Sequence, residues 1–261
     1  MPTRYDWVGL SDGASWPSAE WSITSGSNGA AGTTLDVQAE RGRFEATSSD
    51  RARRCIMQDT DVDVTLNDAE IDTEFEFMTG ADDSVAVTFS LRADGAWLSD
   101  GFGPNEILPN NGYVVRLYAD GRMWLRTMVD GSTQTNHIGG VDQGDSVGPD
   151  IVTRLRFQVE GDQLRVKVWA PASESEPSFS TFTDTEHASG VCATGAASAT
   201  GNFGEVRWDH LDLYDLADTA TVSGQVSQTA PAFTQAVSGE TTIVGAANRR
   251  VRYGSQWWPA P

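Results

Sequence analysis

Lysine is nearly absent from this chain. Lys167 is the single lysine in 261 residues, and the remaining basic residues are arginines, so that 18 Lys and Arg face 37 Asp and Glu and the formal net charge is −19. A protein this acidic is poorly suited to bind nucleic acid directly, because Lys and Arg must neutralise the phosphates. Docking on anionic lipid is disfavoured for the same reason.

Long apolar runs and a secretory leader are also missing. No run approaches the roughly 18 residues needed to span a membrane, and residues 1–10 lack a basic region followed by an apolar one. We therefore expect a soluble chain that is not exported by an ordinary cleaved signal. Only two cysteines are present, Cys55 and Cys192. They cannot form a disulfide framework, and two separate buried thiols are favoured over one long-range bridge.

What the chain does contain is material for a large core. Hydrophobic residues make up 39% and aromatic residues 9%, with nine tryptophans, which argues against a disordered protein. Apolar and polar residues alternate with period two through the middle of the sequence, as in Ile71–Phe77, and no stretch of about a dozen residues keeps a helical period. The sequence therefore predicts an all-β protein.

Turn signals separate the predicted strands. Asp120-Gly121 and Asp130-Gly131 each lie between two strand-like runs, which is a strong hairpin signal. Glu160–Asp162 and Gly80–Asp83 are predicted to be hairpin turns as well. About a dozen short strands with polar turns predict a two-sheet antiparallel jelly-roll sandwich, spanning roughly residues 34–216.

Two flanks differ from this body in composition. Residues 1–33 are rich in Ser, Gly, Ala and Trp and are predicted to be an N-terminal arm that packs on the sandwich or on a neighbour. Residues 217–261 are predicted to be a C-terminal extension, low in charge until an end rich in Arg and Trp. That end is either an assembly arm that binds another chain or a tail folded on its own sandwich. Its residues are Arg249, Arg250, Arg252, Trp257 and Trp258.

Several segments together resemble a known family. They are Val87–Arg92, Gly112–Leu117, Thr153–Gly161, Leu164–Ala170 and Val206–Leu213. These strands resemble the concanavalin A-like (laminin-G-like) jelly roll of minor tail proteins from tailed phages that infect actinobacteria. In addition, Ser223–Gly239 looks like the Gln-Thr-x-Pro-x-Phe-Thr-Gln repeat of such virion proteins, present once.

This resemblance implies a structural virion protein, placed on the tail or capsid and made in the host cytoplasm. Other virion proteins and further copies of the chain would be its partners, with a glycan of the host surface as an additional candidate. Because the same sandwich carries lectins, adhesins and glycosidases, the fold alone does not decide the function. A free carbohydrate-binding module, a family 16-like glycoside hydrolase and a salt-adapted surface adhesin remain as alternatives.

The hydrolase alternative rests on one strand. Glu70–Met78 is similar to the Glu-Ile-Asp-x-Glu strand of family 16 glycoside hydrolases, which would make Glu70 the nucleophile, Asp72 its helper and Glu74 the acid/base. The loops on either side are too short to wall a glycan cleft, and an exposed acidic face explains the pattern equally well. We therefore predict that the chain is not an enzyme.

Two further sets of residues are candidates for binding. Trp97 and Phe102 lie in the one long irregular insertion, where they either stack on a sugar or a partner or cover a sheet edge. A structural Ca²⁺ ion is the one cofactor considered, with Asp209 and Asp212 as weak candidate ligands. The three histidines are scattered without the spacing of a zinc site.

Overall fold

The computed structural model describes two parts of the chain. Side chains are described for residues 3–17, 20–23, 33–46, 56–59, 66–97, 108–198 and 204–216, and backbone alone for 24–25, 53–55 and six short strands between 219 and 259. The chain separates into two compact units, one within residues 2–215 and one within residues 216–261. Each unit is described by itself.

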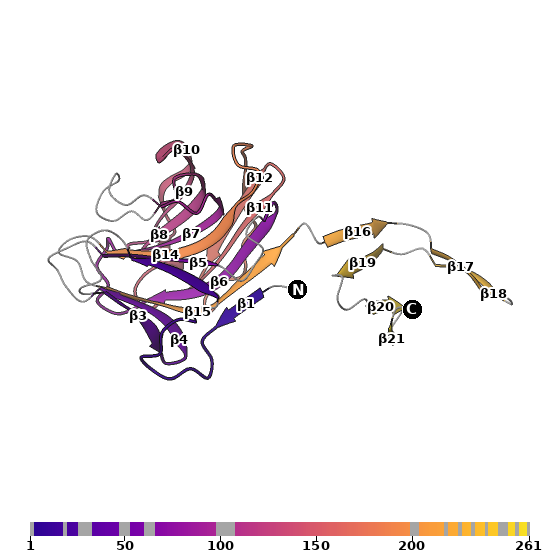
Figure 1. Cartoon of the computed structure of the whole chain (residues 1–261), viewed down its shortest axis with the longest axis horizontal. Coiled ribbons are helices and arrows are strands. Elements are labelled where there is room, and N and C mark those ends of the chain that lie inside the picture. The colour runs from indigo at the N-terminus through magenta and orange to yellow at the C-terminus, as the bar shows by residue number, and fades with distance from the viewer. Residues whose placement is uncertain are drawn as a thin grey trace. The chain divides into compact units, whose positions relative to one another are not determined.

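The larger unit is a sandwich of two antiparallel sheets (Figure 1). Sheet A runs in the order β13 (Ser180–Thr183), β12 (Gln163–Trp169), β11 (Val152–Glu160), β6 (Ala69–Phe77), β15 (Gly204–Asp215), β4 (Arg41–Ala46) and β3 (Thr33–Gln38), with β1 (Thr3–Asp6) also paired to β15. Sheet B runs in the order β10 (Ser132–Asp142), β9 (Arg122–Val129), β8 (Gly112–Tyr118), β7 (Ala86–Ala93), β14 (Val191–Ser198), β5 (Arg53–Asp59) and β2 (Trp21–Ser25). One 3-10 turn, η1 (Gly144–Ser146), lies between β10 and β11.

The predicted all-β jelly-roll sandwich is confirmed, and alternation explains its core. In β6 the inward residues Ile71, Phe75 and Phe77 are at most 1% exposed, and the polar residues between them face away from sheet B. Phe75 packs against Phe89 of the opposite sheet with ring centroids 5.6 Å apart. No helix in the described part of the chain has the length and apolar character needed to cross a membrane.

The Asp-Gly turns form hairpins as predicted. Strand β9 pairs with β8 on one side and with β10 on the other, and β11 pairs with β12 across the turn at Gly161. Asp130 and Gly131 have φ angles of 47° and 73°, the left-handed values that a two-residue hairpin turn requires.

The turn at Gly80–Asp83 does not form a hairpin, contrary to the prediction. It joins β6 in sheet A to β7 in sheet B, so it crosses from one layer to the other. Turn residues indicate that the chain reverses, but they do not determine whether the flanking strands pair or face each other across the core. Here each strand pairs with two neighbours in its own sheet: β6 pairs with β11 and β15, and β7 pairs with β8 and β14.

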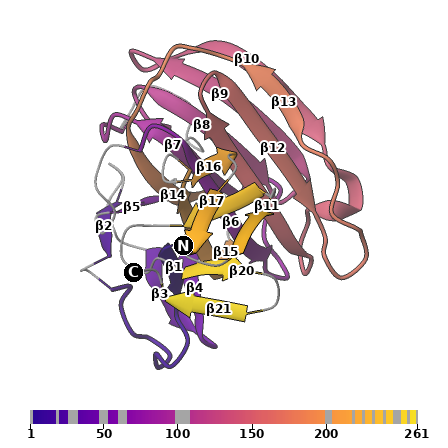
Figure 2. The same ribbon diagram turned by 90° about the vertical axis from the view of Figure 1, so that its right-hand side faces the viewer.

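Residues 3–25, expected in an arm, are built into the sandwich over their described part. Strand β1 pairs with β15 and β2 pairs with β5, so the segment contributes to both sheets (Figure 2). Trp7, Trp16 and Trp21 are at most 3% exposed. The Tyr5 hydroxyl donates a hydrogen bond of 2.7 Å to Asp59 Oδ2, which links the two sheets.

The smaller unit consists of paired strands. β16 (Thr219–Ser223) pairs with β19 (Glu240–Val244), and β17 (Val226–Ala230) pairs with β18 (Phe233–Val237). Ser223 lies opposite Glu240 and Val226 lies opposite Val237, so the two ladders follow one register. They form two separate two-stranded sheets. A further hairpin pairs β20 (Arg250–Tyr253) with β21 (Gln256–Pro259).

Candidate functional site

The acidic row on β6 faces away from the core and is held by arginines of β11. Arg154 makes two hydrogen bonds of 2.9 Å to the Asp72 carboxylate, and its Nη1 lies 3.4 Å from Glu74 Oε1. Arg156 donates to Glu70 at 2.7 Å. The antiparallel register, with Arg156 opposite Asp72, sets each arginine diagonally across from the carboxylate it binds best.

This pairing leaves the family 16-like carboxylates without the openness that glycoside hydrolysis needs. Glu70 and Asp72 are 4% and 5% exposed, and each is an acceptor in an ion pair rather than a free nucleophile. Burial raises the pKa of Glu70, while the hydrogen bond from Arg156 lowers it. Within the described residues the row is the anionic side of an ion-pair ladder.

A β-bulge in β15 builds a different site beside this ladder. Trp208 lies opposite Phe75 and His210 lies opposite Glu74, so Asp209 is the extra residue between them. Trp208 remains in the core, whereas Asp209 and His210 both lie on the outer face. The Thr73 hydroxyl donates a 2.6 Å hydrogen bond to the carbonyl oxygen of His210, which fixes the backbone just after the bulge.

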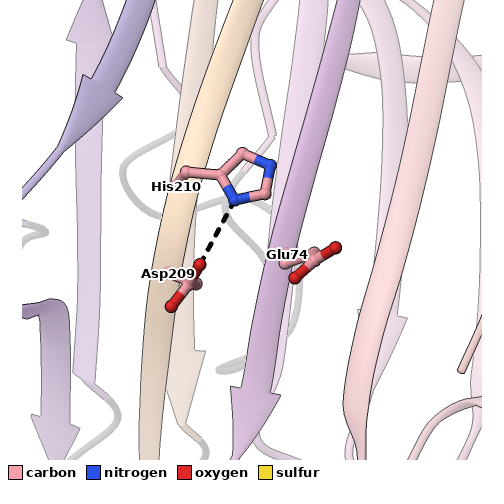
Figure 3. Close-up of side chains that lie close together, drawn as sticks. All are labelled: Glu74, Asp209 and His210. Carbon is pink, nitrogen blue, oxygen red and sulfur yellow. Dashed lines mark hydrogen bonds and ion pairs between the residues drawn. The ribbon is translucent and has the colours of Figure 1, made fainter. Parts of the chain in front are cut away.

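The bulge brings three potential ligands together. One ligand atom each from Glu74, Asp209 and His210 lies within 4.8 Å of the other two. Figure 3 shows Asp209 and His210 on one strand and Glu74 on the next, with the contact between His210 and Asp209 drawn as a dashed line. His210 Nδ1 lies 3.4 Å from Asp209 Oδ2. This combination of an imidazole and two carboxylates could hold a metal ion.

A pocket of about 330 Å³ opens next to these residues. The turn between β3 and β4 forms one wall, and Ala39 and Glu40 there have φ angles of 53° and 57°. Asp12 Oδ1 accepts a 2.8 Å hydrogen bond from the Ala39 amide, which stabilises this turn. The lining residues are Arg4, Asp6, Val8, Ala39, Glu40, Arg41, Asp209 and His210.

The two predicted calcium ligands do not form the cluster. Asp209 joins Glu74 and His210, whereas Asp212 lies opposite Asp72 and is paired with Arg4 at 3.1 Å. Burial raises the pKa of Asp212, and the nearby charge of Arg4 lowers it. The sequence missed Glu74 and His210 as partners because they are 136 residues apart, and only the pairing of β6 with β15 makes them neighbours.

The remaining predicted binding residues lie elsewhere. Trp97 packs, partly buried, on Ile56, Ala193 and Ala197 of sheet B, and Phe102 falls outside the described residues. In the C-terminal unit Arg250 and Arg252 lie in β20, and Arg252 pairs with Trp257 of β21, next to Trp258. Arg249 is also outside the described residues.

The two cysteines lie on neighbouring strands, but they are not opposite each other in the strand register. Cys192 is a free, buried thiol, and burial raises its pKa far above the usual range. Cys55 lies opposite Ala196 of β14, four residues along the strand from Cys192. This offset corresponds to roughly 13 Å, beyond the roughly 7 Å limit for Cα atoms joined by a disulfide. The prediction of two separate thiols therefore agrees with the strand register.

A second polar cluster, not predicted from the sequence, links the sheets near β10 and β13. Thr127 Oγ1 donates to Asp184 Oδ2 at 2.7 Å and lies 2.9 Å from His137 Nε2. The Tyr113 hydroxyl reaches Asp184 at 3.2 Å. Burial alone would raise the pKa of Asp184, but the Glu186 amide, Thr127 and Tyr113 donate hydrogen bonds that lower it overall. The cluster is enclosed, with the His137 and Asp184 side chains 7% and 12% exposed, so we assign it a structural role.

Comparisons with known proteins identify the fold. No protein-family model and no curated protein matches the chain. Among solved structures, it is similar to the VIP36 exoplasmic/lumenal domain in its Ca²⁺/Man3GlcNAc-bound form, with a TM-score of 0.50 and 14% identity over 81% of this chain and 86% of that one. The Emp46p carbohydrate recognition domain, potassium-bound, gives a TM-score of 0.50 and 10% identity over 76% and 89%.

A third similar structure is the carbohydrate-binding module CBM66 from Bacillus subtilis. Its TM-score is 0.46 at 12% identity, over 74% of this chain and 94% of that one. The two structures with a TM-score of 0.50 support the jelly-roll fold of this chain.

Proposed function

We propose that the chain is a non-enzymatic glycan-binding module, mounted on the particle of a tailed virus. The observation that carries the glycan-binding part is the pocket on the outer face of sheet A, where carboxylate, guanidinium and imidazole groups converge. Small-molecule sites typically have a few such polar groups directed into a concave surface. The lectin-like fold is compatible with this role and does not by itself establish it.

The chemistry of the pocket suits sugar hydroxyls. A hydroxyl both donates and accepts hydrogen bonds, so it can bridge a carboxylate and a guanidinium. The Arg4 and Asp209 side chains are 55% and 51% exposed, so both retain hydrogen-bonding capacity toward the pocket. Asp6, Glu40 and Arg41 add acceptors and a donor on the opposite walls.

Substitutions in the pocket test the glycan-binding role. Binding of the full chain to an array of bacterial cell-wall and capsular glycans would be compared with that of Arg4→Ala and Asp209→Asn. Arg165→Ala is the matched control, because Arg165 also forms an outer-face ion pair on sheet A, with Glu160, but lies outside the pocket. Loss of binding in the two pocket variants alone supports the proposal. Binding that survives both substitutions, or no binding by any form, overturns it.

The virion part rests on the tail-type repeat and the architecture of the C-terminal unit. Residues 219–244 contain one charged residue, Glu240, and their described strands form two separate two-stranded sheets. A two-stranded sheet is marginally stable alone in water and requires further packing for stability. Other virion proteins or further copies of the chain would supply that packing, so the assembly partners belong to residues 220–261. Synthesis in the host cytoplasm and a working place on the particle follow from this proposal.

Purified virus particles decide between the virion role and the alternatives. Peptide mass spectrometry should recover the chain in stoichiometric amounts from particles of the source culture, and a chain lacking residues 220–261 should not be incorporated. Absence of the intact chain from particles, with recovery free in the medium or on cells, would instead favour a free binding module or adhesin. Normal incorporation of the truncated chain would contradict the assembly role of the C-terminal unit.

A further inference from the structure

We propose that Glu74, Asp209 and His210 bind a divalent transition metal of the zinc class on the outer face of sheet A. The three residues come from two hydrogen-bonded strands, β6 and β15, and the backbone is pinned by the Thr73 hydrogen bond to the His210 carbonyl. Ligands on adjacent strands are held more rigidly than ligands on loops, which favours a defined coordination geometry. The β-bulge is what allows consecutive residues of one strand to contribute two of the ligands.

The state of His210 points independently to a ligand. Its side chain is 9% exposed, so nine-tenths of it is buried at the edge of the pocket. Within the described residues the imidazole has one hydrogen-bonding contact, to Asp209 at 3.4 Å, which is long for such a bond. Buried polar groups normally have closer partners. A metal ion between the imidazole and the two carboxylates would supply one.

The local charge also favours a cation. Six carboxylates, Glu70, Asp72, Glu74, Glu76, Asp209 and Asp212, lie in this part of the sheet and are paired with four arginines, Arg4, Arg41, Arg154 and Arg156. Six negative and four positive charges leave a surplus of two negative charges, which a divalent ion would neutralise. The arginine contacts at the ligands themselves are loose, 3.6 Å from Arg41 to Asp209 and 3.4 Å from Arg154 to Glu74.

The donor set favours a zinc-class ion over calcium. Imidazole nitrogen is a preferred ligand of zinc and its neighbours, whereas Ca²⁺ takes about 6–8 oxygen ligands. Tetrahedral zinc with bonds of about 2.0–2.1 Å requires donor atoms roughly 3.3 Å apart. In the structure these donor atoms lie within 4.8 Å of one another, so binding would require the side chains to move closer together. Three protein ligands leave a coordination position open, as in zinc sites that exchange water or substrate.

Metal titration of the full chain tests this proposal without any glycan. After dialysis against a chelator, isothermal titration calorimetry with Zn²⁺ and with Ca²⁺ should show one tight Zn²⁺ site per chain and much weaker Ca²⁺ binding. Loss of a residue that only supports a metal ligand typically lowers metal affinity by roughly 10- to 100-fold. Loss of a ligand itself should cost at least as much, so His210→Gln and Asp209→Asn should each lower the affinity for Zn²⁺ by at least this factor. Co²⁺ should give visible absorption bands that change in His210→Gln.

Glu160→Gln is the matched control, because Glu160 is also 51% exposed and paired with an arginine on sheet A, away from the cluster. It should leave Zn²⁺ binding unchanged. Asp209→Asn keeps the test valid if His210→Gln fails to fold, because half of the Asp209 side chain is in solvent. Zn²⁺ binding that is absent, or unchanged in Asp209→Asn and His210→Gln, overturns the proposal. Since no sugar is present, this outcome is independent of glycan binding.

Discussion

Gly42 shows how one missing side chain permits a whole aromatic cluster. A Cβ at this position of β4 would lie 2.5 Å from the Trp7 ring and 2.7 Å from the Trp16 ring. Those rings cannot retreat easily, because Trp16 also packs against Trp21 and Trp208 with ring centroids 5.6 Å apart. The glycine is therefore needed for close approach of rings to the strand.

Gly42→Ala should destabilise the sandwich. We expect a loss of about 1–3 kcal/mol, the usual effect of adding a methyl group to a close-packed core, which corresponds to a fall in Tm of several degrees. Thermal unfolding followed by tryptophan fluorescence measures it. Gly139→Ala is the control, because the nearest heavy atom to its Cβ would be 3.8 Å away. An unchanged Tm for Gly42→Ala would contradict the packing described.

The cluster around Asp184 predicts acid sensitivity. Its folded-state pKa is lowered, so its contribution to stability is fully present above its unfolded pKa of about 3.9 and is lost as pH falls through the folded value. The charged or titratable groups facing it are His137 and Tyr113.

In Asp184→Asn, Tm should be lower than in the wild type at pH 5, and the difference should shrink as pH falls below about 4. Thermal unfolding of both proteins between pH 5 and 3 measures this. Asp83→Asn, in an exposed turn, is the control and should parallel the wild type. A difference for Asp184→Asn that stays constant with pH would exclude the proposed linkage.

At the scale of elements, the β6–β11 pair is held by a ladder of ion pairs. Acidic residues lie along β6 and arginines lie along β11. The carboxylates that are buried on folding, Glu70 and Asp72, therefore each form an ion pair with a guanidinium group. Loss of one partner would leave a nearly buried charge, which costs far more than an exposed ion pair contributes.

Arg154→Met tests this difference. The substitution removes the two hydrogen bonds to Asp72, which is 5% exposed. The free energy of unfolding should fall by about 3 kcal/mol. This value is near the lower limit for buried pairs, because the Arg154 side chain is 34% exposed. Arg165→Met removes a pair with the half-exposed Glu160 and should cost less than about 1 kcal/mol. Urea denaturation compares the two. Equal losses would show that the ladder adds no special stability.

For the whole molecule, the two ends of the chain differ in what they contribute. Residues 3–25 supply the strands β1 and β2 and three core tryptophans. The strands beyond residue 216 belong to a separate compact unit. Large-to-small substitution of one buried tryptophan costs about 3–5 kcal/mol. The loss of three would therefore approach or exceed the total stability of about 5–15 kcal/mol.

Deletion of residues 2–25 should consequently abolish the fold, and deletion of residues 220–261 should leave the Tm of the sandwich unchanged. Near-ultraviolet circular dichroism and thermal unfolding distinguish these outcomes. A cooperative transition in the chain without residues 2–25 would contradict the first expectation, and a Tm lowered by several degrees in the other chain would contradict the second.

The sequence by itself determined the local features of this protein: all-β character, most strands, the Asp-Gly hairpins and the separate C-terminal composition. These follow from side-chain alternation and turn chemistry, which act within a few residues. Only the tertiary structure decided that β6 and β7 face each other across the core, that Trp7 and its neighbours lie inside, and that arginines hold Glu70 and Asp72. It also decided that a bulge sets Asp209 and His210 beside Glu74, because strand pairing and desolvation join residues more than a hundred positions apart, where no local pattern indicates the partner.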